Sequence, residues 1–173
     1  KKITEELIPT FEIAGQQSID LYKKGLKIEI KEDNSPVSNA DLAVDKMICE
    51  KISELTPEIP IISEETVNIK EKNKNSIFWL IDPIDGTKEY ISGKDEYTLN
   101  AALIINKKPV LGLVGVPKKK QLFYAYGIGK SFIKESGIEK KINCKKEIDR
   151  KNISAVSSVE QPSGFIMNIL NKY

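Results

Sequence analysis

A short apolar run followed by two acidic residues, within residues 78–87, places the strongest constraint on how this chain folds. Residues 78–81 are apolar without interruption, which predicts a strand buried on both faces. Asp82 and Asp85 follow at once, and Pro83 lies between them. Carboxylates at the end of a buried strand cost free energy unless an opposite charge compensates them, and a divalent metal ion is the compensator we expect.

The residues after this strand predict a tight turn that gathers oxygen atoms. Pro83 restricts Asp82 to an extended conformation and cannot donate a ladder hydrogen bond, so we expect the chain to turn away from the sheet. Gly86 permits the close backbone turn that follows. The turn can direct both carboxylates and the Ile84 carbonyl into one space, which suits a hard cation. A solvated Asp-Pro turn is the alternative interpretation.

Two other groups can join this cluster. Glu64 and Glu65 follow a short apolar strand at residues 59–62, and Glu64 lies beside Asp82 if the two strands are neighbours. Carboxylates at such close range repel one another without a cation. Thr87 begins a short predicted helix whose first N–H groups suit phosphate oxygens. A surface glutamate pair and an N-cap threonine are the alternative interpretations.

Asp41 lies in the first turn of a helix that the apolar spacing predicts over residues 40–55, and Ser38 precedes it as an N-cap candidate. One interpretation is that the Asp41 carboxylate stabilises the helix dipole. The other is a catalytic role, in which Asp41 accepts a proton from Thr87 while Thr87 accepts one from water.

The composition excludes several kinds of chemistry. The chain has 173 residues and no histidine, which removes Ser-His-Asp and Cys-His catalysis and most zinc sites. Cys49 and Cys144 are isolated, so we expect no disulfide framework and no thiolate metal site, as in a reducing cytoplasm. A metal would therefore be bound through oxygen, which favours Mg²⁺. The net charge of +2 does not suggest nucleic-acid binding, and no apolar run reaches the roughly 18 residues of a transmembrane helix.

The hydrophobic pattern predicts two helices and then mainly strands. The helices span residues 3–24, with Pro9 near the start or at a kink, and residues 40–55. The predicted strands span residues 27–31 (half-buried), 59–62, 77–81, 98–105, 110–116, 122–126 and 153–156, and a last helix spans 164–172. Residues 68–76 are polar and predict an exposed, mobile loop. This order predicts a layered α+β architecture with an antiparallel component.

Several of these segments resemble the inositol monophosphatase superfamily of Mg²⁺-dependent, lithium-sensitive phosphatases. The metal-binding motifs of that superfamily are similar to Ser63-Glu64-Glu65 and to residues 79–87 of this chain. Within the superfamily, residues 33–41, 85–91 and 96–100 are closest to the 3′(2′),5′-bisphosphate nucleotidases of the bacterial CysQ type. The resemblance runs from about Leu7 to Ser158 and so covers nearly the whole chain.

The resemblance implies a fold and a set of site residues. The fold is a layered α/β sandwich of the sugar-phosphatase type, with a largely antiparallel sheet in the first domain. The residues implied to hold Mg²⁺, two or more ions per complete site, are Glu64, Asp82, Asp85 and the Ile84 carbonyl. Asp41 and Thr87 are implied to activate the attacking water, and Glu65 to help hold a water at the metal. The residues implied to contact the scissile phosphate are Gly86, Thr87 and Lys88.

The implied reaction is Mg²⁺-dependent hydrolysis of 3′-phosphoadenosine 5′-phosphate to AMP and phosphate, which removes a by-product of sulfate assimilation. The nearest alternative is the same chemistry on inositol monophosphate or a sugar phosphate. An inactive metal- or nucleotide-binding remnant is the alternative from another class. The implied partner is a small nucleotide rather than a nucleic acid. The resemblance implies no integral membrane segment, and it is compatible with a homodimer. The implied location is cytoplasmic, with a peripheral position on the inner membrane left open.

The resemblance also implies that the chain holds one domain and the start of another. We expect a metal- and phosphate-binding domain over residues 1–150 and the beginning of a second α/β domain over 151–173, because the family continues for roughly another hundred residues. That part carries a Trp-Asp-x-Ala-type motif that completes a second metal site, whereas this chain has only Trp79. A fragment, a truncated gene product and a partial listing of a longer chain all remain open. The first domain alone is expected to bind one metal ion and to hydrolyse poorly.

Overall fold

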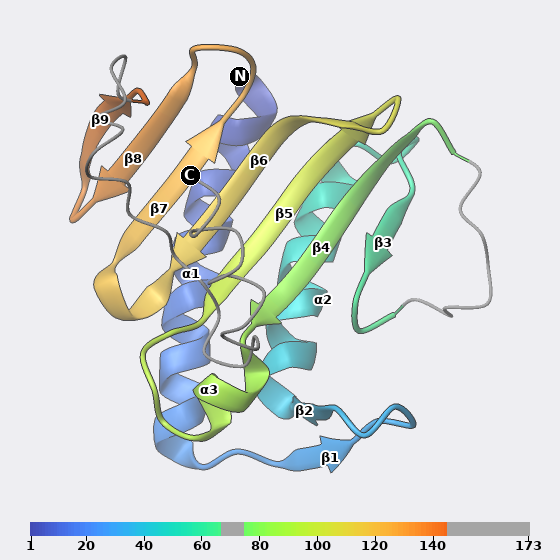
Figure 1. Cartoon of the computed structure of the whole chain (residues 1–173), viewed down its shortest axis with the longest axis vertical. Coiled ribbons are helices and arrows are strands. Elements are labelled where there is room, and N and C mark those ends of the chain that lie inside the picture. The colour runs from blue at the N-terminus through green and yellow to red at the C-terminus, as the bar shows by residue number, and fades with distance from the viewer. Residues whose placement is uncertain (67–74, 145–173) are drawn as a thin grey trace, which may run out of the picture. The chain divides into compact units, whose positions relative to one another are not determined.

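The computed structural model describes residues 1–66 and 75–144 (Figure 1). The chain divides into two compact units, Lys1–Asn143 and Cys144–Tyr173, and everything below concerns the first unit. The predicted second domain, with its strand at 153–156 and helix at 164–172, lies outside the described residues. Most of the loop predicted at 68–76 lies outside them too.

A seven-stranded sheet forms the centre of the first unit, in the order β3-β4-β5-β6-β7-β8-β9 (Figure 1). Its strands are β3 (Ile61–Ser63), β4 (Ile77–Asp85), β5 (Thr98–Ile105), β6 (Lys108–Val116), β7 (Gln121–Ala125), β8 (Ser131–Glu135) and β9 (Ile138–Ile142). The β3–β4 pair is parallel and every other neighbouring pair is antiparallel. The predicted α+β class and largely antiparallel sheet are therefore confirmed.

Two long helices, α1 (Lys2–Lys24) and α2 (Asn39–Leu55), lie behind the sheet in Figure 1 and cover the same face of it. The core between these layers includes Val44, Ile48 and Ile52 of α2, which are 0% exposed. Helix α1 begins at Lys2 and continues through Pro9, so the prediction that the helix starts near the proline is wrong. Pro9 cannot donate a backbone hydrogen bond, but residues on both sides of it are buried, and their packing stabilises the helix there.

Strand β4 differs from its prediction in two ways. Trp79 and Ile81 are buried against the helices, but Leu80 is 47% exposed, so the strand is buried on one face only. The reason is that both long helices cover the same face of the sheet. The chain also does not leave the sheet at Pro83, because β4 runs to Asp85 with a shift in register after Asp82. That irregularity accommodates the missing N–H of the proline.

A separate two-stranded antiparallel sheet, β1 (Ile28–Ile30) with β2 (Pro36–Ser38), connects the two long helices. The predicted strand at 27–31 exists, but it is exposed rather than half-buried, since Ile28 and Ile30 are 48% and 67% exposed. Its alternating pattern therefore does not mark a face that packs on the core. We call residues 28–38 the β1–β2 hairpin.

The predicted hairpin of residues 98–105 and 110–116 is confirmed by β5 and β6. Its turn is shorter than expected, because Asn106 and Lys107 alone make it, with φ values of 49° and 64°. Strands β8 and β9 were not predicted. Every residue of β9 is exposed, so no alternation of apolar and polar side chains marks it. No helix in the described part of the chain is long and apolar enough to cross a membrane.

The packing of α2 predicts the effect of truncating its buried face. Ile48→Ala should lower the free energy of unfolding by about 2–5 kcal/mol, because the change leaves a cavity in a close-packed core. Ile13→Ala is a matched control, since Ile13 is 59% exposed on α1 and its loss should change stability by about 0.5 kcal/mol or less. Urea unfolding followed by the fluorescence of Trp79, the only tryptophan, measures both. Equal losses from the two variants would show that the buried face is assigned wrongly.

Candidate metal and phosphate site

The parallel pairing of β3 with β4 brings the predicted acidic residues together. Ser63 is in register with Ile81, and the Glu64 N–H donates to the Ile81 carbonyl at 3.0 Å. β3 therefore ends beside Ile81 while β4 continues to Asp85, and Glu64 lies next to Asp82. The expectation that the two strands are neighbours is confirmed.

The turn after β4 depends on Gly86. This residue has φ 93° and ψ 41°, a left-handed conformation that favours glycine. A Cβ atom here would lie 2.9 Å from the Glu96 carbonyl oxygen, which is too close for any side chain. Gly86 is also the N-cap of the short helix α3 (Thr87–Ile91), so the N-cap role considered for Thr87 is wrong. Lys88 follows Thr87 on α3 and is exposed.

Buried tyrosines fix α3 against the rest of the unit. The Tyr90 hydroxyl donates to the Ser18 carbonyl of α1 at 2.7 Å, and the Ser18 and Tyr97 hydroxyls lie 2.9 Å apart. The Tyr90 and Tyr97 rings meet edge to face at 4.8 Å. Tyr90 and Tyr97 are therefore core residues, and they hold the start of α3 in place relative to α1.

Asp41 uses its two carboxylate oxygens for different partners. Its Oδ2 accepts hydrogen bonds from the Ser38 N–H at 2.8 Å and the Ser38 hydroxyl at 2.5 Å, which completes a capping box at the start of α2. Its Oδ1 lies 3.1 Å from the Thr87 hydroxyl oxygen. Asp41 is 0% exposed. Both interpretations of Asp41 thus agree with the structure, because the helix-capping contacts and the Thr87 contact occupy different oxygens.

The Thr87 hydroxyl has two acceptors within reach and one proton to donate. Asp41 Oδ1 lies at 3.1 Å and the Ile84 carbonyl at 3.0 Å. The hydroxyl can donate to either of them, and its lone pairs then remain available to accept a proton from a third group. This arrangement links β4, α2 and α3 at a single oxygen atom.

Asp82 carries the clearest electrostatic signal of the site. Its pKa is raised from 3.8 to about 7, first by burial and then by the negative charges of Glu64 and Asp85. Its buried Oδ1 finds no hydrogen-bond partner within the described residues. Asp85 is more exposed and accepts a hydrogen bond from the Asn100 amide of β5 at 3.1 Å.

Glu65 is paired with a residue that the sequence analysis missed. The ammonium of Lys31, in the β1–β2 hairpin, lies 2.9 Å from the Glu65 carboxylate and 3.3 Å from that of Glu64. Burial raises the pKa of Glu65, and the contact with Lys31 opposes this shift. Lys31 follows an exposed strand far from the acidic motifs in sequence, so nothing in its local pattern indicates the contact.

Asp45 is a second residue that the sequence analysis missed. It lies on α2, is 6% exposed, and accepts hydrogen bonds from the Ser63 hydroxyl and, at 3.4 Å, from the Cys49 thiol. The Ser63 hydroxyl in turn accepts from the Glu65 N–H at 3.4 Å. Asp45 therefore fixes the end of β3 from which the two glutamates leave. Helical spacing places Asp45 one turn after Asp41, which is the signal that could have found it.

The donor set suits a hard divalent cation, although the side chains do not yet surround one. Among the described residues, no three Asp, Glu, Cys or His side chains converge closely enough to hold a metal ion. Carboxylates that repel one another are expected to stay apart until a cation arrives. The unpartnered Asp82 oxygen, the raised Asp82 pKa and an all-oxygen donor set nevertheless fit Mg²⁺.

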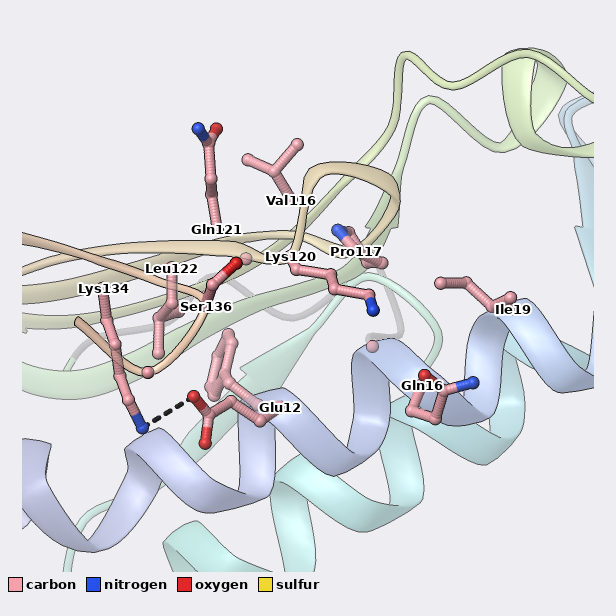
Figure 2. A pocket seen from close by; sticks show the side chains of 14 residues that line it. Glu12, Gln16, Ile19, Val116, Pro117, Lys120, Gln121, Leu122, Lys134 and Ser136 are labelled. Carbon is pink, nitrogen blue, oxygen red and sulfur yellow. Dashed lines mark ion pairs between the residues drawn. The ribbon is translucent and has the colours of Figure 1, made fainter.

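A cavity of about 310 Å³ lies elsewhere, between α1 and strands β6 to β8 (Figure 2). Gln16, Pro117 and Lys120 are among its lining residues, and an ion pair of 2.7 Å between Glu12 and Lys134 closes one side. None of the described residues that line it belongs to the predicted site. The carboxylates and the turn at Gly86, rather than this cavity, therefore define the candidate site.

Comparisons with known proteins show which family the chain resembles. A model of the inositol monophosphatase family matches residues 1–172. The 3′(2′),5′-bisphosphate nucleotidase CysQ of Salmonella typhimurium is 42% identical over 132 residues, which cover 75% of this chain and 53% of that protein. The solved IMPase of Thermotoga maritima has a TM-score of 0.70 at 23% identity, covering 84% of this chain and 55% of its own. An IMPase/NADP phosphatase solved with Mg²⁺ and phosphate has a TM-score of 0.64 at 23% identity, covering 77% and 52%.

The identity and the coverage of each match decide whether it establishes the fold or the family. The two solved structures, at 23% identity, establish the fold alone. The chain spans about half the length of the relatives that it matches. The family model, in contrast, covers nearly every residue of the chain. The chain therefore belongs to the inositol monophosphatase family.

Proposed function

We propose that this chain carries the first part of a Mg²⁺-dependent phosphatase site, which hydrolyses the 3′-phosphate of 3′-phosphoadenosine 5′-phosphate to AMP and phosphate. The observation that supports it most directly is the contact of Thr87 with Asp41, next to the acidic cluster around Asp82. The substrate is proposed from the 42% identity to a 3′(2′),5′-bisphosphate nucleotidase.

The acidic cluster is proposed to be the metal site. The groups that would hold Mg²⁺ are the carboxylates of Glu64, Asp82 and Asp85 and the carbonyl of Ile84. Bound there, Mg²⁺ would supply positive charge that stabilises the charge developing on the phosphate and the leaving oxygen. Asn100, which donates to Asp85 at 3.1 Å, would fix the orientation of that carboxylate.

Thr87 and Asp41 are proposed to move the proton of the attacking water. A water beside Thr87 would give a proton to the hydroxyl oxygen as that hydroxyl gives its own proton to Asp41 Oδ1, 3.1 Å away. The water oxygen then forms the new bond to phosphorus, and the bond from phosphorus to the ribose 3′-oxygen breaks. That oxygen takes up a proton from solvent. Glu65, held by Lys31, would help to position a water at the same site.

The start of α3 is proposed to bind the scissile phosphate. Gly86 permits the left-handed turn that starts this helix, because a side chain there would meet the Glu96 carbonyl oxygen. N–H groups in the first turn of a helix, here those of Thr87 and Lys88, suit phosphate oxygens. The Lys88 ammonium adds a positive charge for a phosphate dianion.

Two alternatives remain and one assay separates them. Phosphate release is measured from 3′-phosphoadenosine 5′-phosphate and from inositol 1-phosphate, each with and without Mg²⁺. We expect Mg²⁺-dependent release that is faster from the bisphosphate. Faster release from inositol 1-phosphate would overturn the substrate assignment, and no release from either would favour a metal- or nucleotide-binding remnant.

Asp85→Asn should abolish the Mg²⁺-dependent release. Asp20→Asn, an exposed change on α1, should leave it unchanged.

Thr87 provides a test of the proton path. Thr87→Val keeps the size of the side chain but removes the hydroxyl, so kcat should fall by about 100-fold or more. Thr87→Ser keeps the hydroxyl and should stay within about tenfold of the original kcat. The Kd for Mg²⁺, measured by calorimetry, should be the same in all three chains because the hydroxyl is not a proposed ligand. Full activity in Thr87→Val would contradict the role of Thr87.

The acidic cluster predicts how stability depends on pH without metal. Asp82 has a pKa of about 7 in the fold, against 3.8 for a free side chain, because burial and Glu64 disfavour its charge. Between these two values the folded state binds a proton that the unfolded state has released, so stability falls as the pH rises through this range. The Tm in EDTA should therefore be lower at pH 8 than at pH 5.

Asp82→Asn should reduce this difference in Tm, since the amide does not titrate. Saturating Mg²⁺ should raise the Tm of the original chain most at pH 8, where the carboxylates are charged. A Tm difference between pH 5 and pH 8 that Asp82→Asn leaves unchanged would show that other groups cause it. Asp20→Asn again serves as the control, because that side chain is exposed on α1.

A further inference from the structure

Lys31, which holds Glu65 in the proposed reaction, also contacts Glu64 in the acidic cluster. Its ammonium lies 2.9 Å from the Glu65 carboxylate and 3.3 Å from that of Glu64. The Lys31 side chain is 24% exposed and that of Glu65 is 4% exposed. This pair is therefore largely shielded from water, unlike the ion pairs on the outer faces of the helices.

The charge of Lys31 acts on the carboxylates that surround Asp82. Burial lowers the pKa of Lys31, but the two glutamates outweigh it, and the pKa is raised overall. Lys31 is therefore charged at any physiological pH. An ammonium within ion-pair distance of both Glu64 and Glu65 offsets part of the repulsion between these carboxylates.

The position of Lys31 in the fold allows this contact to change. Lys31 follows β1 in the β1–β2 hairpin, which forms its own two-stranded sheet and shares no ladder with the seven-stranded one. Its backbone is held by the local turn, where the Lys31 N–H donates to the Ser35 carbonyl at 2.8 Å. The long side chain thus reaches the cluster from an element that can adjust without breaking the central sheet.

We propose that Lys31 is a resident counter-ion of the metal site, which offsets part of the negative charge of Glu64 and Glu65 before a divalent cation binds and competes with that cation afterwards. This inference rests on the proposed Mg²⁺ site. Two cations held by the same carboxylates repel each other strongly at short range. Mg²⁺ must therefore displace the ammonium from Glu64, or share that carboxylate with it, and Lys31 sets the Mg²⁺ affinity below what the carboxylates alone would give.

Replacing the ammonium with an apolar group of similar length tests this directly. Calorimetric titration of the full chain with MgCl₂ should show about fivefold tighter binding in Lys31→Met, the size expected from the loss of one competing, partly buried ion pair. Lys27→Met is the matched control, because Lys27 is exposed one residue before β1 and removes the same charge. Lys31→Arg keeps the charge and should bind Mg²⁺ within about twofold of the original chain. Equal or weaker Mg²⁺ binding in Lys31→Met would overturn the proposal.

A second measurement needs no substitution that could affect folding. The ammonium resonance of Lys31 in a ¹H–¹⁵N spectrum should shift as MgCl₂ saturates the original chain, while that of Lys27 should not. A Lys31 resonance that does not respond to bound Mg²⁺ would overturn the counter-ion role and leave the proposed function intact. If neither the original chain nor Lys27→Met binds Mg²⁺, the proposed metal site itself fails, and this inference fails with it.

Discussion

The structure of the site depends on the repulsion among carboxylates that the parallel pair β3–β4 brings to one edge of the sheet. Glu64 and Asp82 become neighbours because Ser63 is in register with Ile81. Burial of Asp82, together with the negative charges of Glu64 and Asp85, then raises the pKa of Asp82 to about 7. Asp45 holds the end of β3 in place, and Lys31 offsets part of the charge.

The same site links elements that are far apart in the chain. The Thr87 hydroxyl lies within hydrogen-bonding distance of α2 through Asp41 and of β4 through Ile84. Tyr90 ties α3 to α1 through the Ser18 carbonyl. The position of the Thr87 hydroxyl is therefore set by packing in the core rather than by a flexible loop, which is the condition for a catalytic group to be held in a productive geometry.

The sequence allowed the helices, the β4 strand, the hairpin of β5 and β6 and the acidic motifs to be predicted, because apolar periodicity and Asp-Pro-x-Asp-Gly are local signals. It did not predict β8, whose side chains are mostly half-buried, or β9, whose side chains are all exposed. It also overestimated the burial of Leu80, since a continuous apolar run does not reveal whether both faces of a sheet are covered. Lys31 was missed for a related reason, because its contact depends on tertiary structure alone.

Asp41 illustrates how two demands can fall on one side chain. One of its oxygens caps α2 through Ser38 and the other faces Thr87. An amide at this position would retain an oxygen for the cap but lose the basicity that the proposed chemistry needs, and a longer carboxylate would misplace both contacts. A substitution at residue 41 would therefore change the stability of this helix and the proposed chemistry of the site together.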